Sequence, residues 1–200
     1  MTTLTSLPLA PEAQDLLFRE ARTANTFTDE PIGDDVVEAI YDLVKWAPTS
    51  MNTQPLRVLL LRSDDAKERL LKHMGGNNRD KTAAAPLVAV LAADTSFHDD
   101  LPRTFPHFPA ARDMYAEDTS LERVARFNAT LQIGYFLLGV RAAGLAAGPM
   151  AGFDATGFDE DLLAGTTLRS LLVVNIGHPG PDAWFDRLTR LETDEVVRTL

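Results

Sequence analysis

The stretch LERVARFNATLQIGYFLLGVRAAGL, residues 121–145, decides the fold class of this 200-residue chain. It predicts one continuous helix about 37 Å long, at 1.5 Å per residue. From Ala129 onward, small and apolar residues occupy most of its circumference, so we expect the helix to be buried centrally or in a subunit interface. Gly134, Gly139 and Gly144 are interpreted as helix-packing positions, because they do not follow a strand as a dinucleotide-binding glycine motif would.

Shorter elements surround this segment. Apolar spacing, capping residues and prolines predict helices over 11–22, from Asp34 to Pro48, from Ser63 to His73 and in a last turn near Asp194. Short apolar runs predict strands at Leu56–Leu61, Leu87–Ala93 and Leu171–Ile176. A turn is expected at Gly75–Asn78 and a long loop over 94–115. Helices interleaved with strands indicate an α/β or α+β fold.

Length and composition predict a single globular domain over residues 1–200. Nineteen Lys and Arg against 29 Asp and Glu give a net charge of −10. This acidic balance argues against nucleic acid or an anionic membrane as a partner, because phosphate contacts need clustered basic residues. The absence of cysteine excludes a disulfide framework, a thiolate metal site and a cysteine nucleophile.

Targeting and metal-binding signals are also weak. Residues 1–10 carry no charge, and the longest apolar run, Ile133–Val140, is far shorter than the roughly 20 residues of a membrane span. We therefore expect a soluble, cytoplasmic protein. The histidines lack metal-ligand spacing, and His98 with Asp99 and Asp100 is interpreted as a solvated loop, so no metal is expected.

Five polar or small-residue groups stand at predicted turns, while phosphate-loop and nucleophile-elbow motifs are absent. The groups are Arg22–Asn25, Pro48–Asn52, Asn78 with Lys81, Gly148–Gly152 and Arg187 with Arg190. Each has a structural interpretation, such as helix capping by Arg22, and a binding one, such as an anion fork at the same residue. Taken singly, none of them decides a function.

The order of these groups resembles the FMN-dependent nitroreductase family over nearly the whole chain. The most specific stretch is APTSMNTQP, residues 47–55, which matches the family's A-P-[ST]-x-x-N-x-Q-P. FTDEPI at 27–32, Asn78 with Lys81 as N-x-x-K, and NIG at 175–177 also match. Within the family, stretches such as KWAPTSMN at 45–52 look most like the malonic semialdehyde reductases of pyrimidine (uracil) degradation.

The resemblance implies a fold and an assembly. The fold would be α+β and three-layered, with a central mixed β-sheet flanked by helices and a long central helix at the dimer interface. The protein would be a homodimer with FMN at the subunit interface, each FMN touched by both chains.

The resemblance also implies roles for the five groups. Arg22 and Arg190, with Arg187 as second choice, would hold the FMN phosphate, because guanidinium forks suit a dianion. Thr23, Ala24 and Asn25 would assist, although Thr23 and Ala24 leave Arg22 as the only charge in this turn. Asn78 and Lys81 would face the pyrimidine edge of the flavin, where Lys81 stabilises negative charge on the reduced ring. The flavin face would be covered by Gly148, Pro149, Met150, Ala151 and Gly152, and the partner subunit would contribute Pro48, Thr49, Ser50 and Asn52.

The implied reaction passes a hydride from NAD(P)H through flavin N5 to a small substrate, most simply malonic semialdehyde, giving 3-hydroxypropanoate. Arg103 or Arg112 would hold the substrate carboxylate. The surrounding lid would be shaped by Phe105, His107 and Phe108. Two alternatives stay open: a broad nitro- or quinone-reductase, and a flavin-binding protein without turnover.

Overall fold

The computed structural model describes residues 7–200, which contain a four-stranded β-sheet of order β1-β2-β4-β3. The strands are β1 (Leu56–Leu60), β2 (Leu87–Asp94), β3 (Ala146–Met150) and β4 (Leu168–Gly177). Every neighbouring pair of these strands is antiparallel, so the mixed sheet that we expected is wrong for the described residues. Two successive helices connect β1 to β2 and return the chain to the end of the sheet that it left, which makes β2 run opposite to β1.

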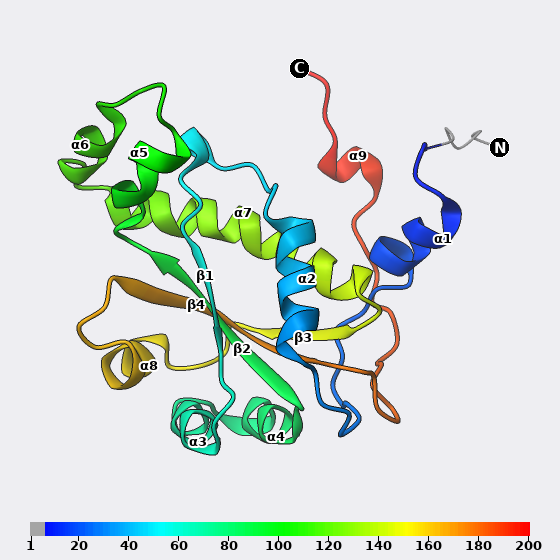
Figure 1. Cartoon of the computed structure of the whole chain (residues 1–200). Coiled ribbons are helices and arrows are strands. Elements are labelled where there is room, and N and C mark those ends of the chain that lie inside the picture. Colours follow the sequence, from blue (N-terminus) through cyan, green and yellow to red (C-terminus); the bar gives the residue numbers. More distant parts are fainter. Residues whose placement is uncertain (1–6) are drawn as a thin grey trace.

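Helices cover both faces of the sheet (Figure 1). One face carries α2 (Asp34–Val44) and the long α7 (Leu121–Ala142). The other carries α3 (Asp64–Lys72), α4 (Gly76–Ala84) and α8 (Ala155–Leu162). The three-layer α+β arrangement built around a long helix is therefore confirmed.

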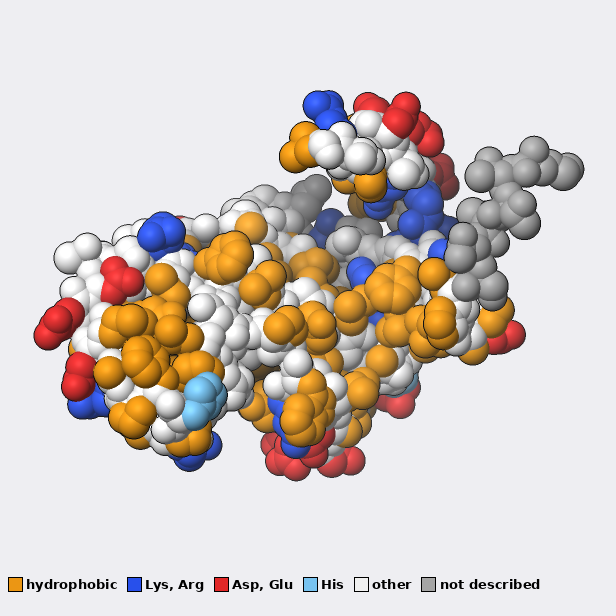
Figure 2. Space-filling view, turned by 90° about the horizontal axis from the view of Figure 1, so that it is seen from above, with side chains coloured by type: hydrophobic (Ala, Val, Ile, Leu, Met, Phe, Trp, Pro, Cys, Tyr) orange, Lys and Arg blue, Asp and Glu red, His pale blue; other side chains and the backbone are white. Residues whose placement is uncertain are grey.

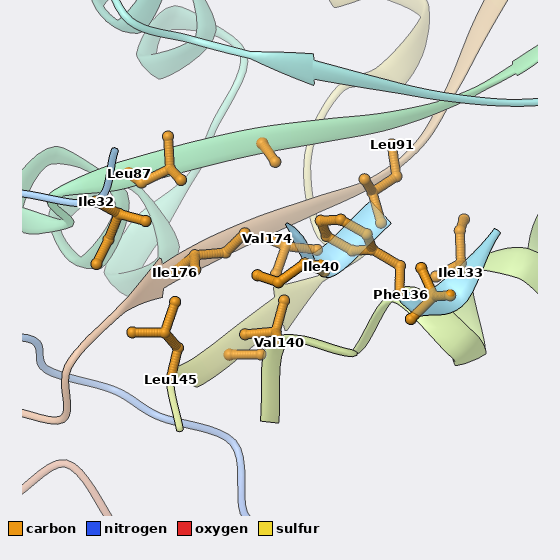
Figure 3. Close-up of a cluster of buried hydrophobic side chains, with 13 residues drawn as sticks. Ile32, Ile40, Leu87, Leu91, Ile133, Phe136, Val140, Leu145, Val174 and Ile176 are labelled. Atoms are coloured by element: carbon orange, nitrogen blue, oxygen red, sulfur yellow. The ribbon is translucent and has the colours of Figure 1, made fainter. Parts of the chain in front are cut away.

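Two apolar clusters join these layers to the sheet. Alternate residues of β2 point to opposite faces, as the period of two in a strand requires: Leu87 and Leu91 belong to the cluster under α2 and α7, and Val88 and Val90 to the cluster over α3 and α8. Figure 3 shows the first cluster, in which Phe136 of α7 packs among side chains of α2 and the sheet. Both faces of β2 are buried, which explains its uninterrupted apolar sequence.

Helix α7 ends three residues earlier than expected, at Ala142. Leu145 N donates to Val140 O at 3.1 Å, and Gly144 N donates to Arg141 O at 2.9 Å. With Gly144 at φ 75°, these two bonds form a Schellman C-cap, in which glycine favours the left-handed conformation. Gly144 is thus a helix terminator rather than a packing position.

The segment expected as a turn at Gly75–Asn78 is instead the start of α4. Glycine and asparagine are typical turn residues, but only Gly76 has positive φ here, at 54°, and the helix continues to Ala84. Packing of α4 against α3 outweighs the local preference. As a consequence, Asn78 and Lys81 lie one turn apart on one helix.

The segment 94–115 is also more ordered than the expected loop. It forms a 3₁₀ turn at Phe97–Asp100, α5 (Leu101–Thr104) and α6 (Ala111–Ala116). Phe97 is fully buried, with its ring centroid 5.1 Å from that of Tyr115, and both belong to a third apolar cluster that includes the first half of α7. Phe97 therefore belongs to a small core, whereas Phe108 of the same segment is exposed.

The segment that follows the first helix meets the segment that precedes α9 near the sheet edge formed by β3. The first helix is α1 (Pro11–Gln14), continued by a π-helical turn to Arg19, and it stops short of the expected Arg22. The residues that follow the helix do not continue it. Among them, Ala24 N donates to Ala147 O of β3 at 3.0 Å. The expected last helical turn is α9 (Thr193–Val196), followed to Leu200 by exposed residues.

Residues 1–6 of the uncharged segment 1–10 lie outside the described residues. Between residues 7 and 200, no helix combines the length and apolar character needed to cross a bilayer.

Candidate functional site

Three arginines surround one cavity of about 240 Å³. Arg22 follows the first helix, whereas Arg187 and Arg190 come from the segment before α9. Arg22 Nη1 donates to Phe185 O at 3.4 Å, and Arg187 Nη2 donates to Ala21 O at 3.3 Å, so the two segments hold each other. This arrangement gathers positive charge from opposite ends of the chain, as an anion site requires.

A lysine and an asparagine continue this site toward α4. Lys81 Nζ, on α4, donates to Asn25 Oδ1 at 2.6 Å. The same ammonium lies 5.7 Å from the ring centroid of Phe185, in cation–π contact. The turn predicted to bind the phosphate, residues 22–25, is therefore in direct contact with Lys81, which is predicted to face the flavin. We call residues 22–25 the predicted phosphate turn. Asn25 of this turn also lines the arginine cavity.

The glycine-containing segment 148–152 joins the site with its first three residues as the end of β3, whereas Ala151 and Gly152 follow the strand as the expected loop. Gly148 lies so close to the predicted phosphate turn that a Cβ there would be 2.7 Å from Ala24 O. At the other end, Asn78 Nδ2 donates to Gly152 O at 3.3 Å. Proline and glycine within β3 hid this strand from a propensity-based prediction.

Contacts behind the site link the chain entering α4 to the chain leaving β3. Met74 and Phe153 form an isolated β-bridge, and Asp154 N donates to His73 O at 2.8 Å. His73 in turn contacts Asp161 of α8 at 3.2 Å. The hydrogen bond from Arg69, and then that from His73, lower the pKa of the Asp161 carboxyl. This network fixes α4 and the 148–152 segment relative to each other.

The segment 48–52 does not join the other four groups. Ser50 N donates to the buried Asn128 Oδ1 of α7 at 2.8 Å, and Asn52 Nδ2 donates to Thr104 O at 2.8 Å. The segment lies just before Pro55, whose carbonyl accepts from Asp94 N at the last residue of β2. Helix α4, in contrast, leads into the first residue of β2. The segment 48–52 and α4 therefore lie at opposite ends of this strand. The seven steps of β2 separate these two ends by about 23 Å at 3.3 Å per residue.

This segment also stores backbone strain. The backbone is left-handed at Met51 and Asn52, with φ values of 48° and 53°, and again just after the segment at Gln54, with φ 44°. Residues other than glycine rarely adopt this conformation. Gln54 N is held by Thr49 Oγ1 at 3.2 Å. Such strain persists only where the surroundings impose it, and it is typical of functional segments.

The residues expected to hold the substrate lie beside this strained segment. Arg103 Nη2 pairs with Asp100 Oδ1 at 3.0 Å, and its side chain is 79% exposed. Arg112 pairs with Asp99 at 3.0 Å and with Asp113 at 3.7 Å. The rings of Phe105 and His107 are in contact, tilted by 56° with their centroids 3.9 Å apart, and Phe108 is exposed. In one chain these five residues therefore do not approach the arginine cavity.

Sequence reasoning missed two residues of these sites. Phe185 lines the arginine cavity and contacts Lys81, and its only signal was an aromatic residue close to Arg187. Asn128 supports the strained segment, and its signal was a polar residue on the buried side of an apolar helix. Within residues 7–200, no three His, Asp or Glu side chains come close enough to hold a metal ion.

Known proteins share both the sequence and the fold of this chain. A relative from Streptomyces coelicolor, provisionally named an NADH dehydrogenase/NAD(P)H nitroreductase, is 60% identical over 98% of this chain and 100% of its own length. The crystal structure of a provisionally assigned nitroreductase from Exiguobacterium sibiricum, in complex with FMN, has a TM-score of 0.82 at 19% identity and covers 98% of this chain and 100% of that one.

A provisionally assigned NAD(P)H:FMN oxidoreductase from Staphylococcus epidermidis has a TM-score of 0.81 at 19% identity, over 97% of this chain and 98% of that one. At this identity the two structures establish the fold alone. The model of the nitroreductase family matches residues 18–178, which include residues 22–25, α4 and β3. The chain therefore belongs to the nitroreductase family.

Proposed function

We propose that this protein binds FMN and acts as an NAD(P)H-dependent reductase. The single observation that carries the proposal is the convergence of Arg22, Arg187 and Arg190 on one cavity, with Lys81 in contact with the same turn. A phosphate dianion suits the arginines, and the pyrimidine edge of a flavin suits the lysine. The structural neighbour in complex with FMN and the relative named for NAD(P)H support this choice.

The local geometry also fits a flat cofactor. A Cβ on Gly148 would lie 2.7 Å from Ala24 O and one on Gly152 would lie 3.1 Å from Asn78 Nδ2, so the backbone there packs closely against the neighbouring elements. At Gly152, whose carbonyl accepts from Asn78 Nδ2, the chain thus presents backbone rather than a side chain beside Asn78. When bound, FMN accepts two electrons from NAD(P)H and passes them to a substrate, so the protein needs no nucleophile of its own.

We further propose that the functional unit is a homodimer. The strained segment 48–52 lies at the opposite end of β2 from Lys81, so one chain cannot place both groups around one flavin. A two-fold partner could supply its own 48–52 segment, because such an interface uses the same surface of both copies. The outer sides of α2 and α7 carry exposed apolar side chains suited to this contact (Figure 2).

For the substrate we propose malonic semialdehyde, supported by the sequence stretches that resemble its reductases. Two electrons and two protons convert the aldehyde to 3-hydroxypropanoate, while NAD(P)H is oxidised. Arg103 is the better candidate of the two arginines for the carboxylate. An ion pair as exposed as Arg103 with Asp100 stabilises the protein by about 1 kcal/mol or less, so a substrate can replace it. Arg112 instead forms ion pairs with two carboxylates, those of Asp99 and Asp113.

The test is an absorption spectrum of the purified protein, recorded before and after anaerobic addition of NADH or NADPH and then of substrate. We expect a bound flavin that one equivalent of reductant bleaches and that malonic semialdehyde reoxidises. Faster reoxidation by a nitroaromatic would favour a broad nitroreductase, and a flavin that neither nucleotide bleaches would favour a non-catalytic binder. A colourless protein that takes up no added FMN would contradict the proposal.

A further inference from the structure

Asn25 connects three separate parts of the chain. Its side-chain oxygen accepts from Lys81 Nζ of α4 at 2.6 Å. Its backbone nitrogen donates to Ala183 O at 3.0 Å, and its side-chain Nδ2 donates to the same carbonyl at 3.3 Å. Ala183 is 1% exposed and begins the segment that carries the two C-terminal arginines. One side chain thus bonds to both the lysine and the C-terminal segment.

The orientation of the Asn25 amide is determined by its neighbours. Nδ2 faces two carbonyl oxygens, those of Ala183 and Thr23, both at 3.3 Å. Turning the amide over would place its oxygen against these carbonyls and its NH₂ against an ammonium, which can only donate. The oxygen of Asn25 therefore points to Lys81 because the surrounding backbone accepts from the nitrogen.

The ammonium of Lys81 remains able to act on a ligand. Of its three donor hydrogens, the bond to Asn25 uses one. Asn25 is neutral, so it orients the ammonium without cancelling its positive charge. An aspartate in this place would cancel it. The ring of Phe185 occupies another side of the ammonium, 5.7 Å away. These two contacts restrict the positions that Lys81 can take.

We propose that Asn25 is a positioning residue for Lys81, and that it couples the place of the ammonium to the docking of the C-terminal segment with Arg187 and Arg190. The inference rests on the proposed function and revises one part of it. The family resemblance implies that Asn25 assists with the phosphate, whereas its side-chain oxygen bonds to Lys81. Phosphate binding at the C-terminal arginines would thus favour the lysine position that stabilises the reduced flavin.

The experiment compares the flavin reduction potentials of Asn25→Ala, Lys81→Met and the double variant, each equilibrated with a reference dye. Loss of the tether should weaken the preference of the protein for reduced over oxidised FMN about tenfold, a shift of about 30 mV to lower potential for a two-electron couple. Lys81→Met should give the larger shift. Adding Asn25→Ala to Lys81→Met should change the potential no further, because the residue acts through the lysine.

Thr26→Val is the matched control. Thr26 Oγ1 donates to Pro181 O at 2.5 Å, which joins the same two segments without touching Lys81. We expect this variant to lower thermal stability and to shift the potential by much less than Asn25→Ala does, because the bond between Asn25 and Lys81 remains. Asn25→Ser, whose hydroxyl is too short to reach Lys81, should reproduce the shift of Asn25→Ala and replaces it if the alanine variant is unstable.

Three results would overturn the inference: an unshifted potential in Asn25→Ala and Asn25→Ser, an equal shift in Thr26→Val, or a further shift in the double variant. Each of these presupposes a wild-type protein that binds FMN and is reduced by NAD(P)H. Failure of the wild type to bind FMN would instead refute the proposed function, so the two failures are distinguishable.

Discussion

The two helical layers of the molecule differ on their outer sides, although both pack apolar side chains against the sheet. Among the described residues, α3, α4 and α8 expose no large apolar side chain. The α2 and α7 layer exposes several, namely Tyr41, Leu43, Phe127, Leu131 and Tyr135 (Figure 2). Isolated exposed apolar residues are ordinary, but a set gathered on one layer indicates contact with another protein surface. The exposed apolar side chains of the α2 and α7 layer therefore suit the homodimer proposed above, whereas the outer side of the α3, α4 and α8 layer suits solvent.

The largest effect should come from charging the outer side of α7. Phe127 is 65% exposed, and we expect Phe127→Arg combined with Leu131→Glu to convert a dimer into a monomer. Because the partner would supply the 48–52 segment, the variant should also bind FMN at least about tenfold more weakly, the loss of roughly 1.4 kcal/mol. Sedimentation velocity and flavin fluorescence titration measure the two effects.

The control for this experiment lies in the other layer. Glu68 is an exposed residue of α3, and Glu68→Lys should leave both the assembly and the FMN affinity unchanged. A wild-type protein that sediments as a monomer and still binds FMN tightly would show that the apolar side of α7 serves another purpose.

A smaller effect should come from the inner side of α7. A Cβ on Gly139 would lie 2.4 Å from Val44 Cγ1 and 3.1 Å from Ile40 Cγ2, both on α2. We therefore expect Gly139→Ala to lower the free energy of unfolding by about 1–3 kcal/mol through overpacking. Urea denaturation measures this change.

Gly134 on the same helix is the matched control, because a Cβ there would meet nothing within 4 Å. Gly134→Ala should leave stability unchanged or raise it by up to about 1 kcal/mol, through better helix propensity. If both substitutions lowered the free energy of unfolding equally, the close packing of α2 on Gly139 would not be the cause of the destabilisation.

The smallest effect should appear at Asp161 of α8, in the layer formed by α3, α4 and α8. The lowered pKa of this carboxyl means that the unfolded chain takes up the proton first as the pH falls, so its stabilising contribution is present at neutral pH and is lost below about pH 4. Its side chain is one-third exposed, which keeps the contribution small. Asp161→Asn should lower the melting temperature by about 2 °C at neutral pH, a shift in the range of a weak surface interaction.

Melting curves of the wild type and Asp161→Asn at pH 7 and pH 3 test this sign. The difference between the two curves should become smaller at the lower pH, because protonation of the carboxyl begins to remove the charge. A difference that is as large at pH 3 as at pH 7 would assign the effect to lost packing rather than to the charge.

Local sequence patterns predicted the elements that have clear boundaries. The helix after Ser63 is confirmed, with Ser63 Oγ accepting from Ala66 N at 3.2 Å, and so are three of the strands. The errors concern segments whose structure depends on distant partners. Residues 75–78 look like a turn but begin α4, and residues 146–150 contain glycine and proline but pair with β4. In these places tertiary packing outweighed a weak local preference.

Most members of the candidate site could also be named from sequence order, but not their arrangement. The contacts of Arg22 with Phe185 and of Lys81 with Asn25 join residues 163 and 56 positions apart. No local pattern encodes such a distance. The separation of 48–52 from Lys81 likewise appears only when the register of β2 is known.

The sequence by itself determined the helical and strand segments with strong apolar periodicity, the absence of cysteine chemistry, and the residue types that suit an anion and a flat ring. These properties depend on neighbouring residues and on composition, so they can be read along the chain. Only the tertiary structure decided that the strands are antiparallel, that Asn25 bonds to Lys81, and that one helical layer is apolar outside. The reason is physical: pairing and exposure are properties of surfaces assembled from residues far apart in the chain.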